Sequence, residues 1–77
     1  MEFKVVNGAV VTIGMLGKLV DSAKEGKNEV QLLIMLASMT LEPKLTEEEY
    51  LALPAKDYAS IKAATAQFQS DVAEAFK

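Results

Sequence analysis

Residues 28–40 are Asn-Glu-Val-Gln-Leu-Leu-Ile-Met-Leu-Ala-Ser-Met-Thr, and this stretch decides the fold of the chain. Asn28 is a good N-cap for a helix, and Glu29 places an acidic group in the first turn, where it suits the helix dipole. Apolar residues then occupy nearly the whole circumference. Because a helix that is apolar all round must be covered all round, we expect residues 28–40 to form the core helix and also to contribute to an interface.

Two shorter helices are predicted on either side of this core helix. Over residues 15–25 the apolar side chains fall on one helical face, and Gly26 is a natural stop. Thr46 and Glu49 fit a capping box, which starts a helix over residues 47–53. That helix should be short, because Pro54 disfavours helical backbone at the residue before it.

A longer helix is predicted over residues 55–76, with Pro54 suited to its first turn. Its apolar residues recur at alternating steps of three and four, which is a heptad-like stripe. The stripe consists of Tyr58, Ile61, Thr65, Phe68, Val72 and Ala75, with Phe76 flanking its end.

The N-terminal residues predict a β-hairpin over about residues 3–13. Residues 3–6 and 9–13 are rich in β-branched side chains, and Asn7-Gly8 between them is the strongest short hairpin signal. A two-stranded hairpin is barely stable alone in water, so it must pack on the helices or pair with another chain. The whole prediction is a single domain, 1–77, with an α+β fold that is mainly α-helical.

The composition excludes several ways of stabilising so small a chain. The sequence has no cysteine, no histidine and no arginine, so disulfides and ordinary metal sites are excluded and we expect no cofactor. A chain of 77 residues buries only roughly 60% of the surface that it exposes when unfolded. We therefore expect self-association or a protein partner to supplement its core.

Charge and hydropathy argue against nucleic acid and membrane as partners. The net charge is −3, and the lysines are scattered rather than gathered in a basic stripe that could contact phosphates. All eight basic residues are lysines, so the chain also lacks arginine, the residue that most often makes a bidentate contact with guanine. The longest unbroken apolar run, residues 32–37, is far shorter than the ~20 residues of a membrane span. Residues 1–4 make a poor signal peptide, so we expect a cytoplasmic protein.

No constellation of residues predicts catalysis, and we expect the chain not to be an enzyme. Gly14 and Gly17 are spaced too closely and too generically to cradle a phosphate. Residues 47–49 are three glutamates, but neighbouring side chains on a helix diverge and do not converge on a cation. The serines have no histidine to activate them.

The positive features are the two apolar helical surfaces. The C-terminal stripe either packs within the molecule or serves a partner helix or a second copy. Methionine side chains either fill gaps in the core or adapt to an irregular partner. The predicted partner-binding residues are Leu33, Met35, Met39, Tyr58, Ile61, Phe68, Val72 and Phe76.

Three motifs carry a resemblance to a known family over about residues 30–77. They are Leu36-Ala37-Ser38-Met39-Thr40, then Thr46-Glu47-Glu48-Glu49-Tyr50-Leu51, then Leu53-Pro54-x-x-Asp57-Tyr58-x-x-Ile61. In these the sequence resembles the tail assembly chaperones of long-tailed bacteriophages. The resemblance implies a small, acidic, self-associating protein of the infected bacterial cytoplasm, without catalytic residues. It also implies that the chain coats the long, helical, aggregation-prone tape measure protein and helps to recruit tail tube subunits, which then replace it.

Two alternatives from other classes stay open. One is a small structural or ring-forming virion subunit, which would use the hairpin edge for assembly and remain in the finished particle. The other is a regulatory or antitoxin-like module, which would bind one folded partner at fixed stoichiometry.

Overall fold

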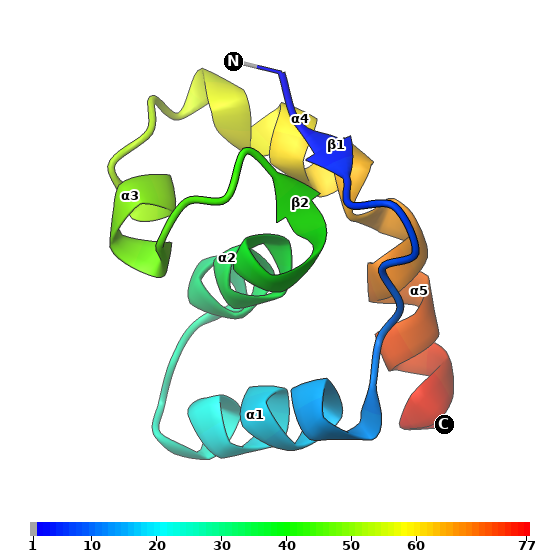
Figure 1. Ribbon diagram of the computed structural model, residues 1–77. Helices are drawn as coiled ribbons and strands as arrows, with labels where there is room; N and C mark the ends of the chain where they lie inside the picture. The colour runs from blue at the N-terminus through cyan, green and yellow to red at the C-terminus, as the bar shows by residue number, and fades with distance from the viewer. Residues whose placement is uncertain (1) are drawn as a thin grey trace.

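Helix α2, Glu29–Thr40, lies at the centre of the molecule, between α1 and α3 (Figure 1). The structure is a computed structural model that describes residues 2–77. The remaining elements in chain order are β1 Lys4–Val5, α1 Ile13–Lys24, β2 Leu41–Glu42, α3 Glu47–Leu51, α4 Lys56–Ala64 and α5 Ala66–Ala75. The predicted α+β fold, mainly helical, is confirmed.

The start of α2 is capped as its sequence predicts. The Asn28 side chain accepts a hydrogen bond from the Gln31 amide at 2.9 Å, and the Gln31 side chain accepts one from the Asn28 amide at 3.0 Å. This reciprocal pair satisfies two amides that have no partner within the helix. The helix ends where Leu41 turns to extended backbone, so the predicted helix over 28–40 is confirmed.

The two shorter helices also form, with small shifts at their ends. Thr12 caps α1, its side chain accepting from the Met15 amide, so this helix starts at Ile13 and includes both Gly14 and Gly17. Gly26, just after α1, has a φ of +90°, a value that favours glycine and turns the chain toward α2. Helix α3 has the predicted capping box between Thr46 and Glu49.

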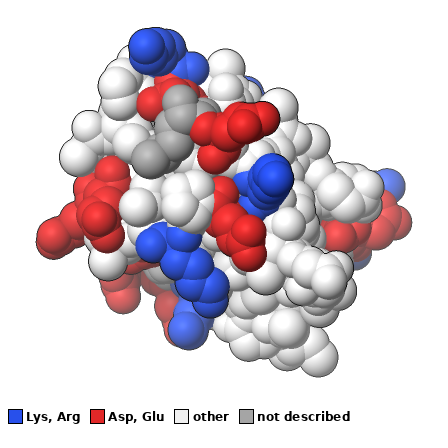
Figure 2. All heavy atoms as spheres, turned by 45° about the horizontal axis from the view of Figure 1, so that its top comes forward, with Lys and Arg blue, Asp and Glu red and all other residues white. Residues whose placement is uncertain are grey.

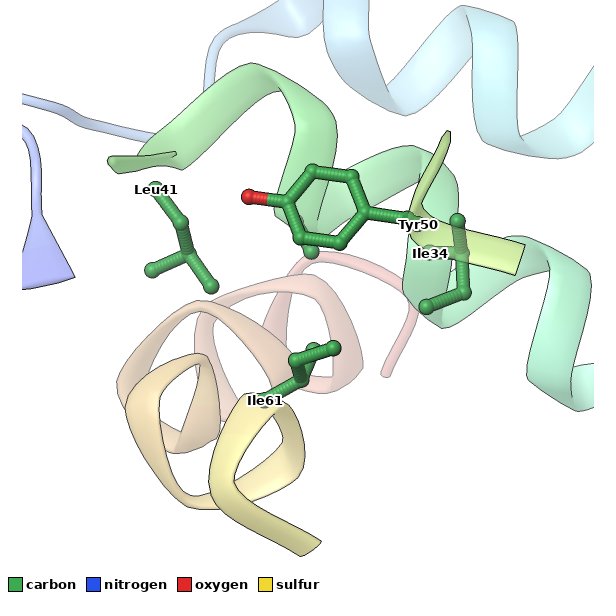
Figure 3. Close-up of a cluster of buried hydrophobic side chains, with 5 residues drawn as sticks. Ile34, Leu41, Tyr50 and Ile61 are labelled. Atoms are coloured by element: carbon green, nitrogen blue, oxygen red, sulfur yellow. The ribbon is translucent and has the colours of Figure 1, made fainter. Parts of the chain in front are cut away.

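Figure 3 shows the main core cluster, in which α2, α3 and α4 meet around a single aromatic ring. Tyr50 of α3 is 2% exposed and Ile61 of α4 is 1% exposed. The Phe3 ring packs against Tyr50 with ring centroids 5.9 Å apart, so the N-terminal segment covers the cluster. The buried members are Ile34, Ala37, Leu41, Tyr50 and Ile61.

The predicted hairpin over residues 3–13 is wrong in its second strand. Asn7 and Gly8 do form a turn, with Gly8 at a φ of +80°. However, β1 pairs antiparallel with β2, with Lys4 opposite Glu42. The Val6 amide extends this pairing by donating to the Thr40 carbonyl at 2.8 Å. Residues 9–12 instead lead into α1, because Thr12 is used as its cap.

The single helix predicted over residues 55–76 is also wrong, because the chain forms two helices that meet at Thr65. Thr65 has φ −95° and ψ 5°, which departs from helical geometry. Its side chain is fully buried, and its hydroxyl donates to the Ile61 carbonyl at 2.9 Å. Threonine hydroxyls that bond back to the preceding turn are known to bend helices. Ile61 of α4 and Phe68 of α5, seven residues apart and so on one face, are both buried.

Within residues 2–77, no helix is long and apolar enough to cross a membrane.

Candidate protein-binding surface

The molecule exposes more surface than its size requires. Its accessible surface is 5084 Å², whereas a compact monomer of 8.3 kDa exposes about 4,600 Å². Its radius of gyration is 11.8 Å, close to the value of about 11.5 Å for a compact 77-residue domain. The molecule measures 32 × 28 × 18 Å along its principal axes, and this flattened shape contributes to the additional area of about 500 Å².

A first hollow of about 200 Å³ lies where α1, α2, α4 and α5 meet. Its wall is mostly apolar, and its polar members are Glu29, Lys62 and Gln69. The apolar members are Leu19, Leu32, Leu33, Leu36, Tyr58 and Val72.

A second hollow of about 360 Å³ lies between α2, α3 and the start of α4. Two large apolar side chains on its border stand out in solvent, Val30 at 44% exposure and Leu51 at 51%. Its complete lining is Val30, Ile34, Tyr50, Leu51, Leu53, Pro54, Ala55, Tyr58 and Ile61, with no charged residue.

Tyr58 forms a wall common to both hollows. Successive residues at the start of α2 line one hollow or the other, because a helix that is apolar all round faces both. Val30 and Ile34 line the second hollow, and Leu32 and Leu33 line the first. The structure thus leaves this first half of α2 incompletely covered on two sides.

The hollows suit apolar groups. Among residues 2–77, no buried side-chain nitrogen or oxygen lacks a hydrogen-bond partner. Tyr50, on the wall of the second hollow, donates from its hydroxyl to the Pro43 carbonyl at 3.2 Å. Burial away from water raises the pKa of this hydroxyl above 10.0, so it stays neutral at ordinary pH.

Charged groups lie interspersed on the outer surface. On the face shown in Figure 2, lysine side chains stand beside aspartate and glutamate side chains, and neither sign forms a continuous field. No group of three or more histidine, cysteine, aspartate or glutamate side chains within residues 2–77 is placed to hold a metal ion. Apolar contact is the chemistry that the lining of the two hollows offers.

The structure divides the predicted partner-binding residues into three sets. Leu33, Ile61 and Phe68 are buried and belong to the interior of the monomer. Phe76 is 57% exposed at the end of α5. The other four are half-buried, namely Met35, Met39, Tyr58 and Val72.

Only some of these residues are brought together at the hollows. Leu33, Tyr58 and Val72 line the first hollow, and Tyr58 and Ile61 line the second. Met35 instead receives a weak hydrogen bond from the Ser22 hydroxyl, with 3.6 Å between oxygen and sulfur, where α1 meets α2. Met39, Phe68 and Phe76 line neither hollow.

The sequence analysis predicted Tyr58 and Ile61 of the second hollow but did not single out Tyr50 and Leu51, which also line it. Tyr50 and Leu51 are adjacent on a five-residue helix and therefore point about 100° apart. Because the packed face of α3 takes Tyr50, Leu51 is left in solvent. Two large apolar residues side by side on so short a helix were the signal, since one face cannot bury both.

Comparison with protein-family models, with curated proteins and with solved structures found no match to this chain. Its function is therefore inferred from the two hollows and from the sequence.

Proposed function

We propose that this chain is a protein-binding assembly chaperone that covers apolar side chains of a partner helix with its second hollow. The observation that carries the proposal is the apolar lining of this hollow, open to solvent beside Val30 and Leu51. Grooves of this kind receive an amphipathic helix through apolar anchors three and four residues apart. Covering such anchors keeps an aggregation-prone helix in solution.

We further propose that the partner is the tape measure protein of a long-tailed bacteriophage, coated until tail tube subunits are recruited. The support is the overlap between the family resemblance and the hollow. Tyr50 and Leu51 lie in one of the motifs that carry the resemblance, and Leu53, Pro54, Tyr58 and Ile61 lie in another. All six line the second hollow. Leu51, Leu53, Pro54 and Tyr58 are at least partly exposed, whereas Tyr50 and Ile61 are buried behind them.

Coating a long partner requires many copies, and each contact is small. Nine residues line the second hollow, whereas a standard one-to-one interface involves about 20–30 residues on each side. Neighbouring copies that also touch one another gain affinity through effective concentration. Self-association is therefore part of the proposal.

The virion-subunit alternative depended on the edge of a hairpin over residues 3–13. That hairpin is not formed, because β1 pairs with β2. The chaperone proposal does not need a free strand edge.

The test is co-expression with the product of the long helix-rich gene nearest to the gene for this chain, assayed by solubility and pull-down. Leu51→Asp places a charge on the border of the second hollow and should abolish solubilisation. Val10→Asp is the matched control, because Val10 is 64% exposed and lines neither hollow. Far-UV circular dichroism checks that both variants fold.

The proposal stands if the partner becomes soluble with the wild-type chain and with Val10→Asp but not with Leu51→Asp. A partner that stays insoluble with the wild-type chain contradicts the chaperone function. Equal solubilisation by Leu51→Asp contradicts the assignment to the second hollow.

A further inference from the structure

We infer that Asn7 is a site of covalent modification, at which the side-chain amide is lost through attack by the Gly8 backbone nitrogen. The product is aspartate or isoaspartate at position 7. Water is the only other reactant, so the change proceeds without an enzyme. The inference concerns the turn at residues 6–9 and is independent of both hollows and of the proposed function.

The turn that contains Asn7 and Gly8 differs from the one that the sequence predicts. The Ala9 amide donates to the Val6 carbonyl at 3.0 Å, so Asn7 and Gly8 are the central residues of a four-residue turn. Gly8 has a φ of +80°, whereas Asn7 has a negative φ, because among residues 2–77 only glycines have a positive one. This is the pattern of a type II turn. A type I′ hairpin turn requires positive φ at both central residues.

The turn is held by strand pairing on one side only. Before it, β1 pairs with β2, and the Val6 amide donates to the Thr40 carbonyl. After it, residues 9–12 belong to no strand. A hairpin would have held the turn between two paired strands, but the observed fold leaves its second half unpaired.

The two reacting groups are accessible. Asn7 and Gly8 are both exposed, and within residues 2–77 neither the Asn7 side chain nor the Gly8 amide has a hydrogen-bond partner. A Cβ atom added to Gly8 would meet nothing within 4 Å beyond its chain neighbours. Types I and II differ in the orientation of the central peptide. The peptide between Asn7 and Gly8 can therefore rotate, bringing its nitrogen toward Cγ of Asn7, while the bond from Ala9 to Val6 remains.

The chemistry consists of two balanced steps. In the first, a base such as hydroxide takes the proton of the Gly8 amide, and the nitrogen attacks Cγ of Asn7. The new N–C bond closes a succinimide ring, the bond from Cγ to the side-chain nitrogen breaks, and ammonia leaves with a proton from water. Because the two groups belong to adjacent residues, the attack is intramolecular and is favoured by proximity. In the second step, water adds to a ring carbonyl and opens the ring, to aspartate or to isoaspartate.

The other asparagine of the sequence, Asn28, is protected by the fold. Its side chain accepts a hydrogen bond from the Gln31 amide at 2.9 Å, which holds it in place as the cap of α2. The next residue is Glu29, the first residue of α2, and its side chain crowds the nitrogen that would have to attack. Rotation of this peptide would break the cap. We therefore expect modification at Asn7 and not at Asn28.

Modification changes both the charge and the main chain where β1 leads toward α1. The new carboxylate adds one negative charge to the net charge of −3. Isoaspartate carries the main chain through its own side-chain carbon, so one more atom separates Val6 from Gly8. The geometry that lets the Ala9 amide reach the Val6 carbonyl is then lost.

The test uses the whole chain, incubated in native buffer between pH 6 and pH 9 and then analysed by mass spectrometry of its peptides. Cleavage after lysine separates the two asparagines, since residues 5–18 contain Asn7 and residues 28–44 contain Asn28. The first peptide should exchange NH2 for OH at position 7, at a rate that rises with the hydroxide concentration. The second peptide is the internal control and should stay unmodified over the same period. Asn7→Gln keeps a side-chain amide but would have to close a larger ring, so it should lose the exchange.

A comparison with the unfolded chain tests the part played by the turn. Segments that open at nearly zero free energy gain no protection from the fold, so the rate at Asn7 in native buffer should lie within about threefold of its rate in urea at the same pH. The inference is overturned if Asn7 stays unmodified in native buffer, if Asn7 and Asn28 react equally fast, or if the native rate is suppressed beyond that range. All these measurements use the chain without a partner, so they fail or succeed separately from the proposed function.

Discussion

The Gln69 side-chain amide donates a hydrogen bond to the Thr65 hydroxyl at 3.0 Å and a second to the Lys62 carbonyl at 2.9 Å. The Thr65 hydroxyl in turn donates to the Ile61 carbonyl. Together these bonds give side-chain partners to the backbone where α4 ends and α5 begins. Gln69 and Val72, which follow this bend, line the first hollow.

Replacing Gln69 by alanine should weaken this bend. We expect the free energy of unfolding to fall by about 0.5–1.5 kcal/mol, the usual contribution of a partly buried hydrogen bond. Urea denaturation measures it. Gln67→Ala is the matched control, because the exposed bond of Gln67 to Asp71 is worth only about 0.2–0.5 kcal/mol. Equal losses for the two variants would contradict a special role for Gln69.

Phe68→Asp should unfold the domain rather than merely weaken an interface. Phe68 is 5% exposed, so the new carboxylate would be buried without a partner. Phe68→Ala alone should cost about 3–5 kcal/mol, a large share of the roughly 4–12 kcal/mol expected for a chain of this length. Far-UV circular dichroism measures the outcome. A folded Phe68→Asp that has lost only self-association would show that Phe68 is an interface residue.

Phe3→Ala should destabilise the fold, whereas Val10→Ala should not. Phe3 packs on Tyr50 and on the main core cluster, and β1 is fixed to the end of α2. We expect a loss of about 1–3 kcal/mol for Phe3→Ala, measured by thermal or urea denaturation. Val10 is 64% exposed, so its truncation should change stability by less than about 0.5 kcal/mol. A larger effect at Val10 would favour the local hairpin that the structure does not form.

Tyr50→Phe should flatten the loss of stability in alkali. Burial raises the pKa of the Tyr50 hydroxyl in the folded state above its ordinary value of 10.0. The folded protein therefore holds this proton more tightly than the unfolded chain does. The resulting stabilisation is complete below pH 10 and is lost as the pH rises through the folded-state value.

Denaturation curves for the wild type and Tyr50→Phe between pH 7 and 11 isolate this contribution, since every other titrating group is shared. At pH 7 the variant should be less stable by about 1 kcal/mol, because it lacks the hydrogen bond to the Pro43 carbonyl. The difference should shrink above pH 10. A constant difference across the range would show that Tyr50 ionises as readily in the folded chain as in the unfolded one.

The sequence by itself determined the local structure. The caps at Asn28 and Thr46 depend on side chains that bond to amides three residues away, so they act before any distant contact forms. The apolar circumference of residues 28–40 likewise predicted a central helix, because such a surface has to be covered wherever the chain goes.

Only the tertiary structure decided the partner of β1, the bend at Thr65 and the position of the hollows. A strand pairs with whichever edge the rest of the chain presents, and here that edge is the extended end of α2, some 36 residues along the chain. A heptad-like stripe specifies apolar spacing but not whether the helix stays straight. Thr65 became a bend because packing buried its hydroxyl beside the Ile61 carbonyl. The other four helices are short and cover α2 only in part. The apolar side chains that remain in solvent are therefore decided by how the helices pack, and no local sequence pattern specifies this.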